Sequence, residues 1–199
     1  MMLSEILAVP QAALPIAEFK DHLRLGTGFA DDGAQDALVE SYLRAALAAI
    51  EGRIGKALFA RDYLLSLNCW RWPDSQALPL APVQAVGSVT VIDRDGVPDV
   101  IDPSRYRLER DSHRPKLVAE GTLLPGVPTG GTVEIVFTAG FGPAWADVPV
   151  DLGQAVFLLA AGYHENRHES GDRTLALPFG VMALIERWRT VRTFGGGMA

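Results

Sequence analysis

Residues 132–169 read TVEIVFTAGFGPAWADVPVDLGQAVFLLAAGYHENRHE, and two kinds of hydrophobic periodicity meet within them. Apolar and polar residues alternate over 132–139, which predicts a strand with one buried face. The glycines of 139–143 interrupt this strand, and 148–151 (Val-Pro-Val-Asp) places a proline and an acid where the first turn of a helix favours them. The helix is expected to continue to about Glu169. This segment therefore predicts a strand, a corner and a long helix in direct succession.

Upstream of this segment, the chain predicts helices first and strands afterwards. A short helix is expected over 15–25, and a long one after Asp31 and Asp32, which are good N-cap residues. Gly52 and Gly55, late in that long helix, indicate close packing against another backbone. From Arg61 onward, short alternating runs are separated by prolines that exclude long helices. Residues 61–139 are therefore predicted to form an antiparallel β unit, with a turn at Asp-Arg-Asp-Gly, residues 93–96.

Downstream, Gly171 is expected to end the long helix, and Pro178 can begin a third helix. The predicted fold class is α+β, a small helical bundle with an inserted antiparallel β unit and a C-terminal helical arm. We divide the chain into four parts. They are the N-terminal helices (1–60), the inserted β unit (61–139), the second long helix that completes the bundle (140–172) and the C-terminal docking arm (173–199).

Composition limits the function classes. The 199 residues are 48% hydrophobic and 21% charged, which is typical of a globular protein with a real core. The longest apolar run, 155–163, is shorter than the roughly 20 residues that cross a bilayer, and no signal peptide is evident, so we expect synthesis in the cytoplasm and no membrane contact. The net charge of −6 argues against nucleic acid as the principal ligand. Cys69, the single cysteine, is expected to be a small core residue.

One catalytic motif matches the sequence. His164, Glu165 and His168 spell H-E-x-x-H, which on a helix places two imidazoles on one face for zinc and a carboxylate beside them as general base. The longer metzincin pattern fails at Thr174, where a third histidine would be needed. The motif also falls in the last turn of its predicted helix, which gives a metal ligand little rigid support. A zinc-dependent hydrolase is therefore the alternative reading, and we expect no enzyme, no catalytic or metal-binding residues and no cofactor.

A weaker alternative is a nucleic-acid-binding accessory factor. Trp70 and Trp72 flank Arg71 and could stack on bases, although an aromatic pair that caps a core is the commoner use in an acidic chain. The sequence contains neither a G-x-S-x-G nucleophile motif nor a phosphate-binding G-x-x-x-x-G-K-[ST] loop.

Three short motifs occur in a distinctive order: Leu-Pro-Leu-x-Pro-Val at 78–83, Thr-Ala-Gly-Phe-Gly at 138–142 and Tyr-x-Glu-Asn-Arg at 163–167. In this order, over roughly residues 14–192, the chain resembles the head-tail connector proteins, or neck adaptors, of long-tailed bacteriophages and phage-like gene transfer agents. In that family the helix that carries the third motif is structural, so the resemblance implies that the two histidines within and beside it are incidental. The chain departs from the family at 124–125 (Leu-Pro), where an aromatic residue is expected before the proline.

The resemblance implies a role in assembly rather than in chemistry. Identical subunits would join head to tail in a closed ring, a dodecamer in the particle, with two different patches on each subunit. The implied partners are the portal protein and downstream neck or tail proteins, in a virion or gene-transfer-agent particle, with DNA passing through the ring without specific binding. The C-terminal arm is expected to dock on the portal or on a neighbouring subunit through apolar anchors and complementary charge. The residues expected to bind are Phe179, Leu184, Arg187, Trp188, Arg189 and Arg192.

An alternative for the arm stays open at this point. Leu184 and Trp188 belong to the apolar stripe of the predicted third helix, so they could pack on the helices of their own subunit instead of on a partner.

Overall fold

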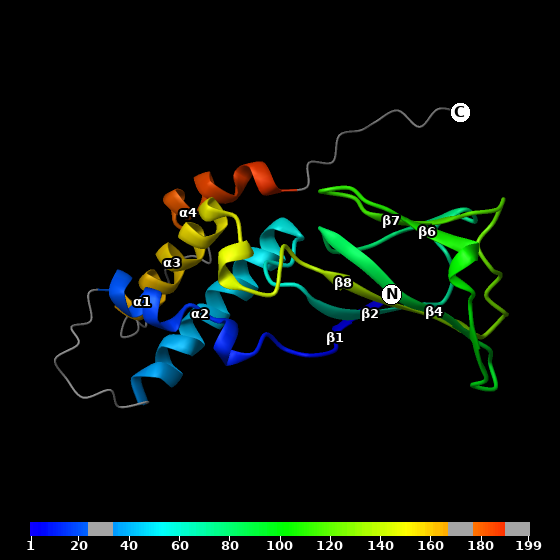
Figure 1. Cartoon of the computed structure of the whole chain (residues 1–199), viewed down its shortest axis with the longest axis horizontal. Helices are drawn as coiled ribbons and strands as arrows, with labels where there is room; N and C mark the ends of the chain where they lie inside the picture. The colour runs from blue at the N-terminus through cyan, green and yellow to red at the C-terminus, as the bar shows by residue number, and fades with distance from the viewer. Residues whose placement is uncertain (24–33, 167–176, 190–199) are drawn as a thin grey trace.

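The computed structural model describes residues 1–23, 34–166 and 177–189. Helices gather in one half of the molecule and strands in the other (Figure 1). This arrangement confirms the predicted α+β class. The helices are α1 (Ile16–His22), α2 (Ala34–Ile54), α3 (Val150–Glu165) and α4 (Phe179–Ile185), with short 3-10 turns at Gln11–Ala13, Pro103–Arg105, Trp145–Asp147 and Glu186–Trp188.

The strands form two antiparallel sheets. A five-stranded sheet has the order β1-β2-β8-β4-β5, and a three-stranded sheet has the order β3-β7-β6. The strands are β1 (Met2–Glu5), β2 (Arg61–Leu67), β3 (Ser75–Ala77), β4 (Val83–Ile92), β5 (Pro98–Val100), β6 (Tyr106–Glu109), β7 (Lys116–Ala119) and β8 (Thr132–Ala139). Buried and half-buried residues alternate along the whole of β8, the central strand, as its period of two predicts.

Each half of the molecule has its own hydrophobic core. In the helical half, the buried faces of α2 and α3 meet around Leu43, Ile50, Leu152 and Val156, and α4 covers α3. In the β half, fully buried residues of the two sheets, among them Leu65, Leu117 and Ile135, form the second core. Among the described residues, none of the helices is both long and apolar enough to span a membrane.

The corner at 139–143 connects the two halves. Gly140 has a φ of 134°, and its N–H donates to the Pro82 carbonyl (N···O 2.9 Å). On the next residues, the Phe141 N–H donates to the Leu58 carbonyl (3.2 Å), and the Gly142 carbonyl accepts from the Ala60 N–H (2.8 Å). The end of β8 is thereby bonded to the segment that links α2 to β2, as the predicted corner requires.

Several local predictions need correction. No strand was expected before Arg61, yet β1 pairs with β2 from Met2↔Ser66 to Glu5↔Tyr63. Its four residues lie at the sheet edge and include none that is fully buried, so the sequence carries no alternating signal there. Helix α3 ends at Glu165, about four residues earlier than predicted, because the backbone of Asn166 (φ −92°, ψ 15°) departs from helical values. The Asn166 side-chain amide donates to the Gly162 carbonyl at 2.9 Å and caps this end.

The structure also tests the predictions for Cys69, for the two glycines near the end of α2 and for the turn at 93–96. Cys69 is exposed rather than buried, because β2 ends at Leu67 and the alternation stops there. A Cβ at Gly52 would meet no atom within 4 Å, so this glycine does not serve close packing. Gly55, with φ 67°, follows the end of α2, and its carbonyl accepts from the Ala81 N–H (3.3 Å), so this glycine does lie against another backbone segment. The turn after β4 is confirmed: a carboxylate oxygen of Asp93 accepts from the backbone N–H groups of residues 95 and 97, each at 2.9 Å.

Candidate assembly site

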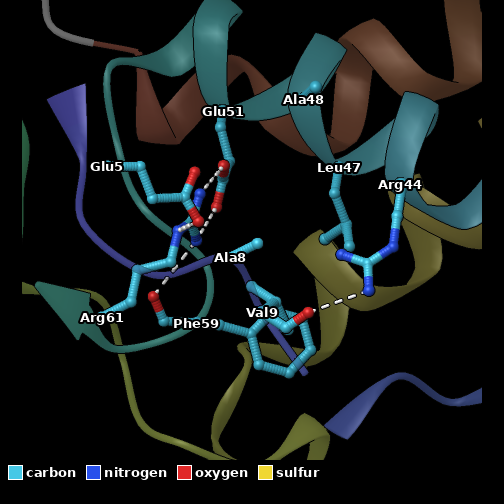
Figure 2. A pocket seen from close by; sticks show the side chains of 9 residues that line it. All are labelled: Glu5, Ala8, Val9, Arg44, Leu47, Ala48, Glu51, Phe59 and Arg61. Atoms are coloured by element: carbon cyan, nitrogen blue, oxygen red, sulfur yellow. Dashed lines mark hydrogen bonds and ion pairs between the residues drawn. The ribbon is translucent and has the colours of Figure 1, made fainter. Parts of the chain in front are cut away.

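Arg61 lies where α2, β1 and β2 meet, and Figure 2 shows it between two carboxylates. Its two terminal nitrogens bond to the Glu51 carboxylate at 3.0 and 2.7 Å, and its Nε lies 2.7 Å from a Glu5 oxygen. Glu51 also accepts the backbone N–H of Leu58 at 2.7 Å. The Arg61 and Glu51 side chains are only 13% and 14% exposed. One guanidinium therefore connects the long helix, the first residue of β2 and the N-terminal strand.

The neighbouring carboxylates favour the ionised form of Arg61. Burial alone would lower the pKa of Arg61, but the hydrogen bond and charge of Glu51, with smaller contributions from Tyr63 and Glu5, raise the pKa above its ordinary value. The guanidinium also lies over the Tyr63 ring, 5.2 Å from its centre. A buried charge that is held by two carboxylates in this way is costly to leave unpaired.

An open groove runs along the extended segment after β1. Seven of its ten lining residues are apolar, its volume is about 560 Å³, and it lies between Leu7–Pro10, Phe59–Asp62, Thr138 and Pro143. A smaller pocket, drawn in Figure 2, shares part of the same segment and includes the Arg61 network. The segment is fixed beside α2 by Arg44, which donates to the Val9 carbonyl at 2.9 Å.

Helix α4 and the 3-10 turn that follows it contain most of the residues that the sequence singled out for partner binding. Val181 and Ile185 are buried against α3. Leu184 and Trp188 also pack against this helical core, which is the alternative that the sequence left open. The Trp188 indole N–H donates to Asp151 at 2.7 Å, and its ring meets Phe141 edge-on at 5.4 Å.

The remaining four residues of that set differ in their surroundings. Phe179 is 89% exposed. Arg187 lies 2.8 Å from Asp151 and over the Trp188 ring, and Arg189 pairs with Glu186 at 3.0 Å. Arg192 lies outside the described residues. Phe179 is thus the large apolar member of the set that projects away from the subunit.

The zinc hypothesis gains no support from the described part of the chain. His164 lies in the last turn of α3, where its ring meets Tyr42 edge-on at 5.9 Å between ring centres. Glu165 is the last residue of the helix, and His168 lies outside the described residues. Among the residues that the structure describes, no group of three or more His, Cys, Asp or Glu side chains could hold a metal ion.

The tryptophan pair is divided between core and surface. Trp70 packs against the β core, and its indole N–H donates to the Pro125 carbonyl at 2.6 Å. Trp72 is 62% exposed. The core-capping interpretation is therefore right for Trp70 and wrong for Trp72.

Sequence reasoning did not find the buried charged residues. Lys56 is 1% exposed, and its ammonium donates to the Ser112 carbonyl and lies 3.3 Å from His113 Nδ1. Burial lowers the pKa of Lys56, and the nearby Asp111 opposes that shift. Like the Arg61 network, this contact joins segments that are far apart in the chain. No spacing along the sequence identifies such partners.

Solved structures provide close relatives of the whole chain. A chain in the neck of an empty gene transfer agent (GTA) particle, computed with C6 symmetry, is 60% identical with a TM-score of 0.89. A chain in the virion of a native GTA particle is 59% identical (TM-score 0.86), and one in the neck of a native GTA particle, computed with C12 symmetry, is 54% identical (TM-score 0.83). Each alignment covers 98% of this chain and 99% of the other. No protein-family model and no curated protein matches.

These similarities place the chain in the class of structural proteins from the neck of phage-like particles. At 54–60% identity over nearly the full length, the chain belongs to the family of neck adaptors of phages and gene transfer agents. The predicted family and its structural role are confirmed.

We predict that Tyr63 weakens the fold at alkaline pH. The residue is 5% exposed and stacks on Phe137, and burial raises its pKa well above the ordinary value, although Arg61 opposes the shift. The unfolded state therefore loses this proton first, at about pH 10, so stability is complete below that pH and falls above it. In urea unfolding from pH 8 to 11, Tyr63→Phe should show a shallower decline than the wild type. Parallel pH curves for the two proteins would contradict this assignment.

Proposed function

We propose that this chain forms the ring that joins the portal of a GTA or phage particle to the neck and tail proteins below it. The observation that carries the proposal is the near full-length identity to chains in necks that were computed with C6 and C12 symmetry. A ring of twelve copies satisfies both symmetries, because C6 is a subgroup of C12. Twelve identical subunits in a closed ring need head-to-tail contacts between two different patches on each copy.

The charge of the chain suits a conduit for DNA. With a net charge of −6, the subunit disfavours adhesion to phosphates, so DNA could slide through the ring without specific binding. The work of such a protein is mechanical connection, and none of its residues needs to act as a catalyst.

The C-terminal segment is the proposed docking element of the ring. Asp151 holds Trp188 and Arg187 at the beginning of α3, which fixes the orientation of α4 on the subunit. Phe179 is then presented to a partner on a rigid support, as anchor residues of interfaces usually are.

Deletion of the gene tests the proposal in the particle. We expect filled heads that lack tails, restoration of tails by the wild-type chain, and density for this chain in the neck by electron microscopy. Tailed particles at normal yield without the chain would overturn the proposal.

A His164→Ala/His168→Ala double variant separates the adaptor from the zinc hydrolase. An adaptor in which these histidines are incidental should assemble at wild-type yield, and the purified wild-type chain should contain no stoichiometric zinc by elemental analysis. One bound zinc per chain that the double variant loses would instead support the hydrolase.

A further inference from the structure

Helix α4 is apolar on both of its faces. Its seven residues, FGVMALI, include no charged or polar side chain. Val181 and Ile185 face the core, while Phe179, Gly180 and Ala183 are exposed. Leu158 of α3, 38% exposed, lies beside Gly180 and extends this surface. A helix that is hydrophobic all round is normally buried, yet the outer face of α4 is not covered by any part of the chain that the structure describes.

The apolar groove beside Leu7–Pro10 is a fitting receptor. Leu7 is 73% exposed on its wall, and no described segment of the chain fills it. Its volume of about 560 Å³ accommodates a phenyl ring with the adjoining helix turn. In Figure 1, α4 lies along the upper margin of the helical half and the segment after β1 along its lower margin. In this view, α4 and the segment after β1 that lines the groove therefore lie at opposite margins of the helical half.

We propose that the exposed face of α4, led by Phe179, seats in the groove beside Leu7–Pro10 of the next copy of this chain. The inference rests on the proposed ring and names the contact that closes it. A heterologous ring needs one protruding and one receiving patch on each subunit, on different sides, and these two surfaces meet that requirement. Because α4 carries no charge, its own burial removes no ion from water, and it would contact mainly the seven apolar residues of the groove rather than Arg61 and Asp62.

The free edges of the five-stranded sheet are a poorer basis for the ring. The edge strands β1 and β5 lie four strand intervals apart, and neighbouring strands differ in direction by roughly 20–25°. The sheet thus accumulates a twist of about 80–100° within one subunit. Edge pairing between copies would need the same strand direction to recur at every step of the ring, which this twist prevents.

Disulfide trapping in assembled particles tests the contact. In a Cys69→Ser background, we would make one chain with Phe179→Cys and another with Leu7→Cys, and incorporate both into the same particles. Oxidation should give dimers that join a Phe179→Cys chain to a Leu7→Cys chain, in a yield at least tenfold above that from particles with either variant alone. A heterologous contact requires this asymmetry, because neither position meets its own copy.

A matched control makes each outcome decisive. The pair Thr90→Cys/Val100→Cys, Cα partners across β4 and β5, should form an internal disulfide under the same conditions. If this control forms and the chain is in the neck, but Phe179→Cys cross-links to the portal or to nothing, the inference is wrong and the adaptor role stands. If the chain is missing from the neck, the proposed function itself fails.

Substitutions at Phe179 give a second measurement. Phe179→Asp should abolish ring formation, whereas Phe179→Leu should still allow it, and circular dichroism should show that both variants are folded. Normal rings from Phe179→Asp would overturn the inference.

Discussion

Gly140→Ala is expected to lower the free energy of unfolding by about 3 kcal/mol or more. The residue has a φ of 134°, which side chains other than hydrogen rarely permit, and the added Cβ would overlap the backbone of Phe59 and Ala60. Relief of that overlap requires the corner to move away from the α2–β2 link. The Gly140 and Phe141 N–H bonds to Pro82 and Leu58 would then weaken as well. Urea unfolding followed by circular dichroism measures the loss.

Gly52→Ala is the matched control, because it adds the same methyl group in a different setting. Gly52 lies within α2, and a Cβ there would meet nothing within 4 Å. Alanine should therefore raise stability by about 0.5–1 kcal/mol through its better helix propensity. If the two substitutions had equal effects, the special backbone of Gly140 would not be the cause of its sensitivity.

The sequence predicted those parts of the fold that depend on local periodicity. The alternation in β8, the Pro-Val-Asp start of α3 and the Asp93 turn all act within a few residues, and each is confirmed. The order of three short motifs indicated the family, which the similarity to chains of gene-transfer-agent particles confirms.

Contacts between distant segments could not be predicted in the same way. Strand β1 gains its place only from pairing with β2, about sixty residues later, and its own four residues show no pattern. The groove beside Leu7–Pro10 is built from three separate parts of the chain. For Trp188, the sequence left open whether it packs on a partner or on the helices of its own subunit, because an apolar stripe is the same in both cases. The bond to Asp151, 37 residues away in the chain, could not be predicted from spacing.

Arg61→Leu is expected to destabilise the protein by about 3 kcal/mol, because it leaves Glu51, which is 14% exposed, and the more exposed Glu5 (36%) without their cation. Glu51 would keep only the Leu58 N–H as a partner, and Glu5 would lose its 2.7 Å contact with the guanidinium. Since Glu5 is the last residue of β1, the loss should also release the N-terminal strand. Hydrogen exchange should show this as faster exchange of residues 2–6 in the variant than in the wild type, with a smaller change in β8.

Two control variants separate the network from charge in general. Arg94→Leu removes an arginine whose side chain is 76% exposed and 3.5 Å from Asp95, and it should change stability by less than about 0.5 kcal/mol. Arg61→Lys keeps the charge but cannot form the two parallel bonds to Glu51, so its effect on stability should lie between those of the two leucine variants.

The same variants should differ in ring assembly. Because the groove proposed to receive α4 is lined by Arg61 and by the segment after β1, Arg61→Leu should also impair assembly, whereas Arg94→Leu should not. Equal losses of stability for Arg61→Leu and Arg94→Leu would show that the three-element network contributes nothing beyond an ordinary surface charge.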